Sequence, residues 1–292
     1  MLPIDKDGYV KSFTYDQREE IIDFLNEYGV VVVRDILSND RINETINSIW
    51  NHDELTSRGV KRDDVGTWER CWPRNGQIER KGWICTYDDM KCITSWKNRF
   101  EPKLVDVFEN LWHDSGGKRD LRVKLDRYGV MRPLINKSWR TDDGWLHTDQ
   151  NPVTEKDVVK FQGILTISDS TENTGGFLCI PGFHKEWKEY CASGRPDEDV
   201  CPFLTSSDGR AEKVTAKAGS LIVWDSRLPH CNYPNDSEDK FRMVQYITYH
   251  PVEFESDKRR RFRKEDALWI DKYLRDNGYK LGEKQLRFIG YY

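Results

Sequence analysis

The spacing of apolar residues over the first fifty positions predicts a helix, a buried strand and a second helix. Apolar side chains recur at helical intervals in residues 12–28, and Gly29 provides a helix stop. The uninterrupted run VVVVRDIL (30–37) is typical of a strand that is buried on both faces. Helical spacing returns in residues 38–51, where Ser38 can cap the first turn. The chain is therefore expected to begin with helix, strand and helix.

From residue 121 the pattern changes to short alternating or continuous apolar runs, separated by clusters of Gly, Pro, Asn and Asp. The strand candidates are LRVKLDRYGVMRP (121–133), GWLHTD (144–149), VKFQGILTISD (159–169), GGFLCIPG (175–182), GSLIVWDS (219–226) and RMVQYITYHP (242–251). Many short strands without long intervening helices favour an antiparallel sandwich or barrel over a parallel sheet.

These patterns predict one domain over residues 1–292, mainly β with flanking helices. Residues 1–120 are expected to support the core with helices and a strand, residues 121–252 to form the β core, and residues 253–292 to form a helical extension. Residues 50–120 are polar and rich in tryptophan, with short helical segments of unclear extent. A chain of 292 residues is long enough to bury one large core.

Net charge and cysteine content bear on the expected partners and on the cellular compartment of the protein. The formal net charge of −4 provides no overall attraction to nucleic acid, and the basic run KRRRFRK (258–264) is expected to be a solvated face. The seven cysteines are odd in number and lack paired metal-binding spacing, so we expect reduced thiols in a cytoplasmic protein. No apolar run approaches the length of a membrane span, and a monomer is the default expectation.

The triplet HTD, residues 147–149, is the first candidate for metal chemistry. On a strand, His147 and Asp149 would point to the same face, because successive side chains alternate. A core histidine bonded to a neighbouring aspartate explains the same triplet equally well. The stronger signal is a second histidine, His230, which follows a buried strand and precedes Arg242 by twelve residues.

Two histidines and one carboxylate leave three positions of an octahedral ion open on one side. That arrangement suits Fe(II) when both a cosubstrate and dioxygen must bind. The planar guanidinium of Arg242 can then pair with a carboxylate at the far end of a ligand that chelates the iron.

These motifs resemble the Fe(II)/2-oxoglutarate-dependent oxygenases, in particular the phytanoyl-CoA dioxygenase-like family. The resemblance covers most of residues 12–252 and rests on HTDQNP, TGGFLCIPGFHKEW, AGSLIVWDSRLPHCN, the downstream arginine and the opening segment YGVVVVRDILSNDRI. It implies a double-stranded β-helix core (jelly-roll, cupin-like), Fe(II), 2-oxoglutarate and dioxygen. It further implies oxidation of a C–H bond in a small molecule of secondary metabolism, with release of succinate and CO2. Hydroxylation is the default outcome, and desaturation or ring closure would use the same ligands.

By this resemblance, His147, Asp149 and His230 are the iron ligands, and Arg242 binds the distal carboxylate of 2-oxoglutarate. In halogenating relatives a small residue replaces the carboxylate ligand, so Asp149 argues against halogenation. Further contacts with the cosubstrate are expected from Asn232, Gln162 and Lys124. An outward-facing Lys124 and a Gln162 that pairs across the sheet are the alternatives.

A carboxylate-bearing metabolite needs a cationic anchor near the ligand strands, and large aromatic side chains there can wall the pocket. The candidates for substrate contact are Arg122, Arg132, Arg140, Trp145, Trp224 and Arg227. Ordinary core packing is the alternative for the two tryptophans. His184 is expected beside the mouth of the barrel, and the other histidines (His52, His113 and His250) are expected at surface or core positions.

Three alternatives remain open from the sequence. The first is a non-catalytic small-molecule or iron-binding protein on the same fold, since a scaffold does not prove a reaction. The second is a cupin-like enzyme with another metal, although such sites usually draw on three or four histidines. The third is an oxygenase that acts on a macromolecule, which only the basic run 258–264 favours.

Overall fold

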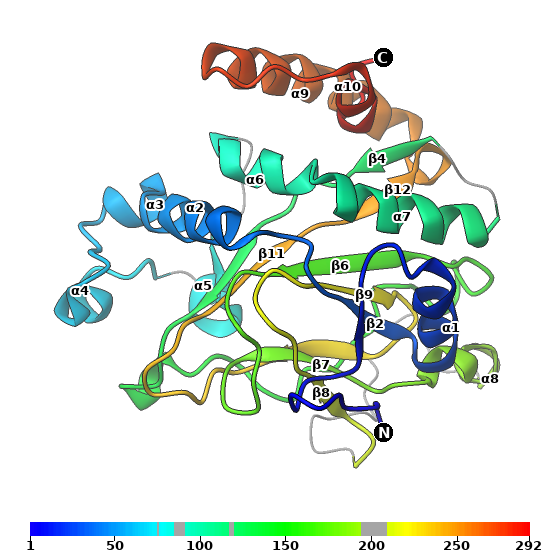
Figure 1. Ribbon diagram of the computed structural model, residues 1–292, viewed down its shortest axis with the longest axis horizontal. Coiled ribbons are helices and arrows are strands. Elements are labelled where there is room, and N and C mark those ends of the chain that lie inside the picture. The colour runs from blue at the N-terminus through cyan, green and yellow to red at the C-terminus, as the bar shows by residue number, and fades with distance from the viewer. Residues whose placement is uncertain (75, 85–90, 117–119, 194–208) are drawn as a thin grey trace.

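The centre of the molecule is a β-sandwich of two sheets that face each other (Figure 1). The computed structural model describes residues 1–74, 76–84, 91–116, 120–193 and 209–292. In spatial order, the large sheet contains β1 (Ser12–Phe13), β2 (Val30–Val33), β9 (Leu221–Asp225), β6 (Phe161–Thr166), β11 (Arg242–Tyr246), β5 (Tyr128–Met131) and β3 (Trp83–Ile84). The second sheet contains β10 (His230–Tyr233), β7 (Gly176–Cys179) and β8 (Glu212–Val214). A third, two-stranded sheet pairs β12 (Tyr249–Pro251) with β4 (Leu121–Val123).

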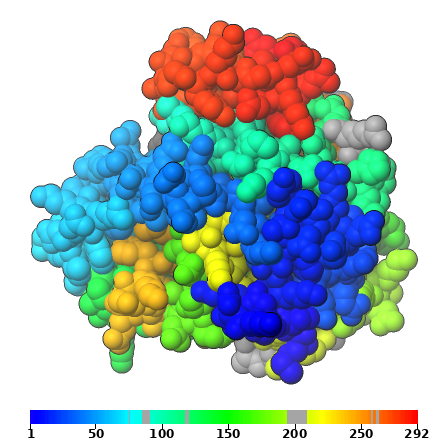
Figure 2. Space-filling model, in the orientation of Figure 1, coloured from blue at the N-terminus to red at the C-terminus, as the bar shows by residue number. Residues whose placement is uncertain are grey.

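Helices surround this sandwich. They are α1 (Arg18–Tyr28), α2 (Asn39–Trp50), α3 (Asp53–Thr56), α4 (Val65–Arg70), α5 (Gly76–Lys81), α6 (Ile93–Arg99), α7 (Pro102–Asp114), α8 (Trp187–Ala192), α9 (Asp257–Asp276) and α10 (Glu283–Ile289). Single 3-10 turns occur at Lys137–Trp139, Phe183–Lys185 and Val252–Phe254. Figure 2 shows the C-terminal helices (red) as a cap at one end of the molecule. Among the described helices, none has both the length and the apolar content needed to cross a membrane.

The first helix and strand are joined at a glycine that the structure requires. Gly29 ends α1 with a φ of +74°, a backbone conformation that side chains with a Cβ rarely adopt. A Cβ at this position would also lie 2.5 Å from Nδ1 of His184 and 2.8 Å from a methyl group of Leu228. The strand β2 therefore enters the large sheet directly beside the segment that precedes the second predicted metal ligand.

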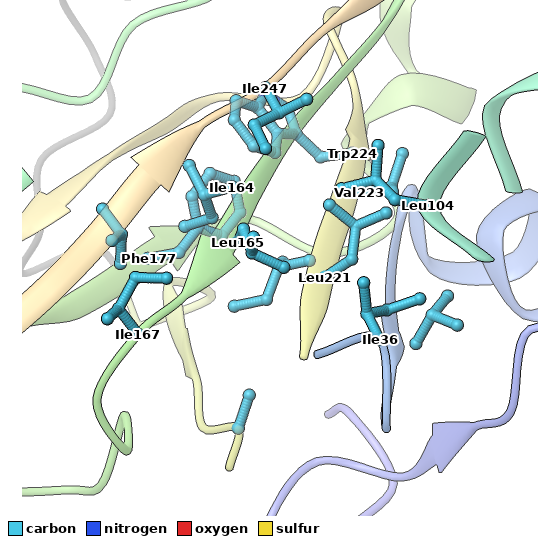
Figure 3. Close-up of a cluster of buried hydrophobic side chains, with 14 of the residues drawn as sticks. Ile36, Leu104, Ile164, Leu165, Ile167, Phe177, Leu221, Val223, Trp224 and Ile247 are labelled. Atoms are coloured by element: carbon cyan, nitrogen blue, oxygen red, sulfur yellow. The ribbon is translucent and has the colours of Figure 1, made fainter. Parts of the chain in front are cut away.

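The middle of the large sheet has two different faces. A Cβ at Gly163 of β6 would lie 3.0 Å from the ring of Phe108, so this face packs against α7. The adjacent residue Gln162 points to the opposite face, where its partner in the register is Trp224 of β9. The ring of Trp224 lies 4.6 Å from that of Phe177 on the second sheet, and Figure 3 shows these side chains within the packed core. The face that carries Gln162 therefore lines the interior of the sandwich.

The predicted fold class is confirmed: antiparallel sheets dominate, and helices precede and follow the β core. The helix, strand and helix expected at the start are α1, β2 and α2, and Ser38 caps α2 by accepting from the backbone N–H of Arg41 at 3.3 Å. The free state of the cysteines is also confirmed for the described ones: Cys71, Cys92, Cys179, Cys191 and Cys231. Cys85 and Cys201 lie outside the described residues.

Several expected elements need correction. The segment 144–149 is not a strand, because its only ladder contact is an isolated bridge between His147 and His230. The single strand expected over 121–133 is two strands, since β4 pairs with β12 whereas β5 pairs with β11 and β3. Residues 242–251 divide in the same way into β11 and β12.

The expected C-terminal helical extension consists of two helices, α9 and α10. The basic run 258–264 belongs to α9 and is not entirely a solvated face. Arg263 is buried, lies 2.6 Å from the carboxylate of Glu255 and donates to the carbonyl oxygen of Val123 at 2.7 Å. This arginine therefore attaches the helix to the core.

Candidate metal centre

Three side chains from two segments of the chain lie close together beside the second sheet. His147 and His230 are held side by side by reciprocal backbone hydrogen bonds of 3.1 and 2.9 Å. Asp149 follows in the same loop as His147, and its two carboxylate oxygens lie 3.4 Å from Nε2 of His147 and 3.3 Å from Nε2 of His230. One ligand atom from each residue lies within 4.8 Å of the others, so together they can hold a single metal ion.

Neighbouring groups orient each of the three side chains. The Nδ1 atom of His230 lies 2.9 Å from the carbonyl oxygen of Leu228, and that of His147 lies 3.3 Å from the carbonyl oxygen of Trp145. A carbonyl can only accept, so Nδ1 carries the hydrogen and Nε2 offers its lone pair to a metal. Both imidazole rings are thus held in the tautomer that can bind a metal ion through Nε2.

The carboxylate of Asp149 is oriented by Gln162, whose amide nitrogen donates to it at 2.5 Å and to the hydroxyl of Ser226 at 3.3 Å. Burial acts to raise the pKa of Asp149, but the adjacent imidazoles of His147 and His230 outweigh it, and the pKa lies well below its usual range. The group is therefore an anion and supplies the negative charge that a divalent cation needs.

The pocket around the three side chains has a volume of about 120 Å³. It is lined by Trp83, Lys124, Asp126, Arg127, Trp145, His147, Asp149, Gln162, Phe177, Trp224, His230, Cys231, Asn232 and Tyr246. Aromatic rings cover both imidazoles: Trp145 stacks on His147 at 5.0 Å and Phe177 on His230 at 5.4 Å between ring centroids. These rings keep water from the outer faces of the two ligands.

Arg242 lies in the adjoining interior and is only 1% exposed. One terminal nitrogen donates to the side-chain oxygen of Asn232 at 3.0 Å, and Asn232 also bonds to the hydroxyl of Tyr246. Nε and Nη1 of Arg242 have no hydrogen-bond partner in the described part of the chain. Gly129 leaves room beside them, because a Cβ there would lie 2.9 Å from Nη1. A buried guanidinium with two unsatisfied donors fits an anionic ligand with two oxygen atoms.

The structure brings five of the other predicted site residues to the pocket wall: Lys124, Trp145, Gln162, Trp224 and Asn232. Gln162 forms a hydrogen bond with the predicted metal ligand Asp149. Asn232 forms a hydrogen bond with Arg242, the predicted cosubstrate-binding residue. The indole nitrogen of Trp224 is buried and has no partner among the described residues. Both predicted tryptophans, Trp145 and Trp224, are among the lining residues.

Two of the predicted substrate arginines lie elsewhere because other groups hold them. Arg122 lies 2.5 Å from the carboxylate of Asp120 beside the C-terminal helix α10. The guanidinium of Arg132 lies between the rings of Trp72 and Trp139, at 5.0 and 4.3 Å from their centroids. Burial lowers the pKa of Arg132 to about 10. Neither side chain lines the pocket around the metal ligands.

The other two predicted arginines are neutralised by acidic partners. Arg140 lies 2.8 Å from Asp236, and Arg227 makes two hydrogen bonds of 2.9 and 2.5 Å to Asp225. The remaining described histidines also stand apart from the triad. His52 caps α3, His184 contacts the carbonyl oxygen of Asn26, and His250 pairs with Glu255.

Six pocket residues were missed by the sequence reasoning: Trp83, Asp126, Arg127, Phe177, Cys231 and Tyr246. Tyr246 lies four residues after Arg242 on β11, so the two-residue period of a strand places both on one face and offered a signal. Trp83 comes from the tryptophan-rich region without a clear pattern. Asp126 and Arg127 were taken for the middle of a strand, whereas they form the connection between β4 and β5.

Comparison with known proteins supports the assignment that this geometry suggests. A protein of Dictyostelium discoideum that is named after phytanoyl-CoA dioxygenase is 25% identical, over 90% of this chain and 89% of its own. The Ava biosynthesis cluster protein O of Aspergillus versicolor is 24% identical, over 84% of this chain and 82% of its own. The crystal structure of the epimerase SnoN in complex with Fe3+, alpha ketoglutarate and nogalamycin RO shares the fold. Its TM-score is 0.54 at 16% identity, over 81% of this chain and 84% of that one.

The family model for phytanoyl-CoA dioxygenase matches residues 25–244, more than half of the chain. This match confirms the predicted class of enzyme, an oxidoreductase of the dioxygenase type. The chain belongs to the phytanoyl-CoA dioxygenase family.

Proposed function

We propose that the protein is an Fe(II)- and 2-oxoglutarate-dependent dioxygenase that oxidises a C–H bond of a small, carboxylate-bearing metabolite. The observation that carries the proposal is the combination of a His–Asp–His triad with a buried arginine whose donors lack partners. Iron and 2-oxoglutarate held at this site would supply the dioxygen chemistry that oxidises the C–H bond, with release of succinate and CO2.

In this proposal His147, Asp149 and His230 hold the iron through two imidazole nitrogens and one carboxylate. Their backbone bridge and their bonds to neighbouring carbonyl groups fix the ligands before any metal arrives. Gln162 prevents Asp149 from rotating away by donating to the same carboxylate oxygen that faces His230.

Arg242 is proposed to bind the distal carboxylate of 2-oxoglutarate, with Asn232 as the residue that orients its guanidinium. The low exposure of Arg242 excludes water from this ion pair, which strengthens the electrostatic attraction. Lys124 lines the pocket around the proposed metal ligands and is partly exposed.

We propose secondary metabolism as the setting. The Aspergillus relative is named for a biosynthetic cluster, and SnoN was crystallised with a nogalamycin compound. Hydroxylation is the proposed default, while desaturation or ring closure would need only a different hold on the substrate radical. We further propose that residues 1–292 act as one catalytic domain, monomeric and cytoplasmic.

The test is anaerobic. Fe(II) and then 2-oxoglutarate are added to the metal-free protein, and the visible charge-transfer band of a chelated 2-oxo acid is recorded. The wild type should show the band, His147→Ala should lose it together with the metal, and Arg242→Ala should retain metal but require far more 2-oxoglutarate. No band in the wild type would refute the proposed function.

A further inference from the structure

One wall of the metal pocket carries two cations that neither the triad nor Arg242 uses. Lys124 and Arg127 belong to the connection between β4 and β5, and both line the pocket that contains the metal ligands. Asp126 lies between them with a side chain that is 10% exposed, whereas those of Arg127 and Lys124 are 33% and 39% exposed. Two cations and one anion leave this wall with a net positive charge.

Asp126 contacts the guanidinium of Arg127 only at Nε. A single carboxylate oxygen accepts from the backbone N–H of Arg127 at 3.0 Å and from its Nε at 2.9 Å. Its other oxygen lies 3.7 Å from Nζ of Lys124. The two terminal nitrogens of Arg127 have no hydrogen-bond or ion-pair partner among the residues that the structure describes. They are therefore available for a ligand within the pocket.

Aromatic side chains fix the guanidinium and extend from it toward the metal ligands. Arg127 lies over the ring of Trp83, 4.5 Å from its centroid. Trp83 meets Trp145 edge to face at 6.1 Å and donates its indole N–H to the hydroxyl of Tyr246 at 3.1 Å. Trp145 in turn stacks on His147. A continuous aromatic wall thus connects the free edge of Arg127 with a metal ligand.

We propose that Arg127, assisted by Lys124, binds the carboxylate of the substrate, and that the flat apolar part of the substrate lies along Trp83 and the edge of Trp145. The ring of Trp145 already has Nζ of Lys81 over it at 3.3 Å and His147 stacked on it. This inference rests on the proposed function and names the substrate class, a small flat carboxylate. The two arginines have different roles: Arg242, buried beside the pocket, binds the cosubstrate, and Arg127, partly exposed on the pocket wall, binds a molecule that enters from solvent. The four arginines that the sequence suggested already have other partners. Arg122 pairs with Asp120, Arg132 lies over Trp72 and Trp139, Arg140 pairs with Asp236, and Arg227 pairs with Asp225.

The test compares an acid with its amide. Binding of trans-cinnamate and of cinnamamide, which differ in charge but not in shape, is measured by saturation-transfer NMR on the zinc-loaded protein with 2-oxoglutarate. In the wild type, cinnamate should bind about ten times more tightly than cinnamamide, the effect of one charge-assisted contact. Arg127→Gln should remove this preference by weakening only cinnamate, and Lys124→Gln should reduce it about threefold.

The matched control is Arg18→Gln, since Arg18 is an exposed arginine paired with Asp106 between α1 and α7. It should leave both affinities unchanged. Equal binding of the two probes to the wild type, binding of neither, or an acid preference that survives in Arg127→Gln would overturn the subsite.

The charge-transfer band separates this inference from the proposed function. Arg127→Gln should keep the wild-type affinity for 2-oxoglutarate, because Arg242 supplies that contact. Loss of the band in Arg127→Gln, with the band retained in Arg242→Ala, would show that Arg127 is the cosubstrate anchor and would refute the subsite. No band in the wild type would refute the proposed function, whatever Arg127 binds.

Discussion

Replacing Arg242 by methionine should stabilise the ligand-free protein while abolishing tight binding of 2-oxoglutarate. Methionine has a similar length but no donors. The native guanidinium is 1% exposed and leaves Nε and Nη1 without partners in the described structure. A buried unsatisfied donor costs about 1–3 kcal/mol, and more when it is charged. Removing two of them outweighs the loss of the single bond to Asn232, whose oxygen still lies 3.0 Å from the hydroxyl of Tyr246.

A net gain of about 2 kcal/mol corresponds to a rise in Tm of roughly 4 °C for a chain of this size. The same substitution should weaken the binding of 2-oxoglutarate. Truncating one partner of a buried charge pair costs about 2–5 kcal/mol, so the affinity for 2-oxoglutarate should fall by on the order of 100-fold or more. In the wild type, 2-oxoglutarate at about 100 times its Kd should add roughly 2.7 kcal/mol of stability, and the variant should gain roughly 0.4 kcal/mol or less at that concentration.

The assay combines thermal unfolding of the metal-free protein with anaerobic titration of 2-oxoglutarate into the Fe(II)-loaded protein. Arg227→Met is the matched control. The guanidinium of Arg227 is satisfied by two bonds to the buried Asp225, so the same substitution there should lower Tm. If Arg242→Met also lowered Tm and left 2-oxoglutarate binding unchanged, Arg242 would be a structural residue and the reasoning would be refuted.

Three further predictions concern the support of the site and of the fold. Gln162→Leu should weaken metal binding about 10- to 100-fold, because the carboxylate of Asp149 loses its hydrogen-bond donor. Competition with a fluorescent chelator measures the metal affinity, and an unchanged affinity would contradict the prediction. Gly29→Ala should cost at least about 2 kcal/mol, since it combines a φ of +74° with a contact of 2.5 Å; an unchanged Tm would show that the neighbouring imidazole can move. Burial raises the pKa of Glu255, but the hydrogen bond from His250 and the charge of Arg263 outweigh it and lower the pKa. The stabilisation by Glu255 is therefore complete above pH 4.5, its unfolded value, and is lost as the pH falls through the lower folded value. Glu255→Gln should melt below the wild type near pH 7 and approach it at about pH 3, and a constant gap would exclude this origin.

The strands of the sandwich were predictable where the pattern of burial repeats along the chain. The run 30–33 is buried throughout, and β9 is equally continuous, because both strands lie inside the large sheet. The strand expected over 144–149 failed because a strand also needs a partner along its whole length. Here the backbone touches β10 at one bridge and then turns away. Alternation alone does not reveal that difference.

The three residues of the candidate metal centre could be identified from the sequence because their order and spacing along the chain form a pattern. His147 and Asp149 lie together, although they occupy a loop and not the predicted strand. Trp83 and Arg127 were not predictable, since the reason for their presence is a contact with each other across 44 positions of the chain. Such pairs have no local pattern.

The arginines illustrate why a charge that is visible in the sequence does not identify a binding site. Arg140 and Arg227 stand close to the ligand motifs in sequence, yet each already has a carboxylate partner that the fold supplies. Arg242 and Arg127 differ from them in what remains unpaired: two nitrogens in the dry interior for Arg242, and one exposed edge at the pocket wall for Arg127. A cationic side chain can bind a ligand only with donors that have no partner within the protein. Which donors remain without a partner depends on the folded structure and cannot be read from the sequence. The position of these free donors distinguishes the proposed cosubstrate anchor, Arg242, from the proposed substrate subsite at Arg127.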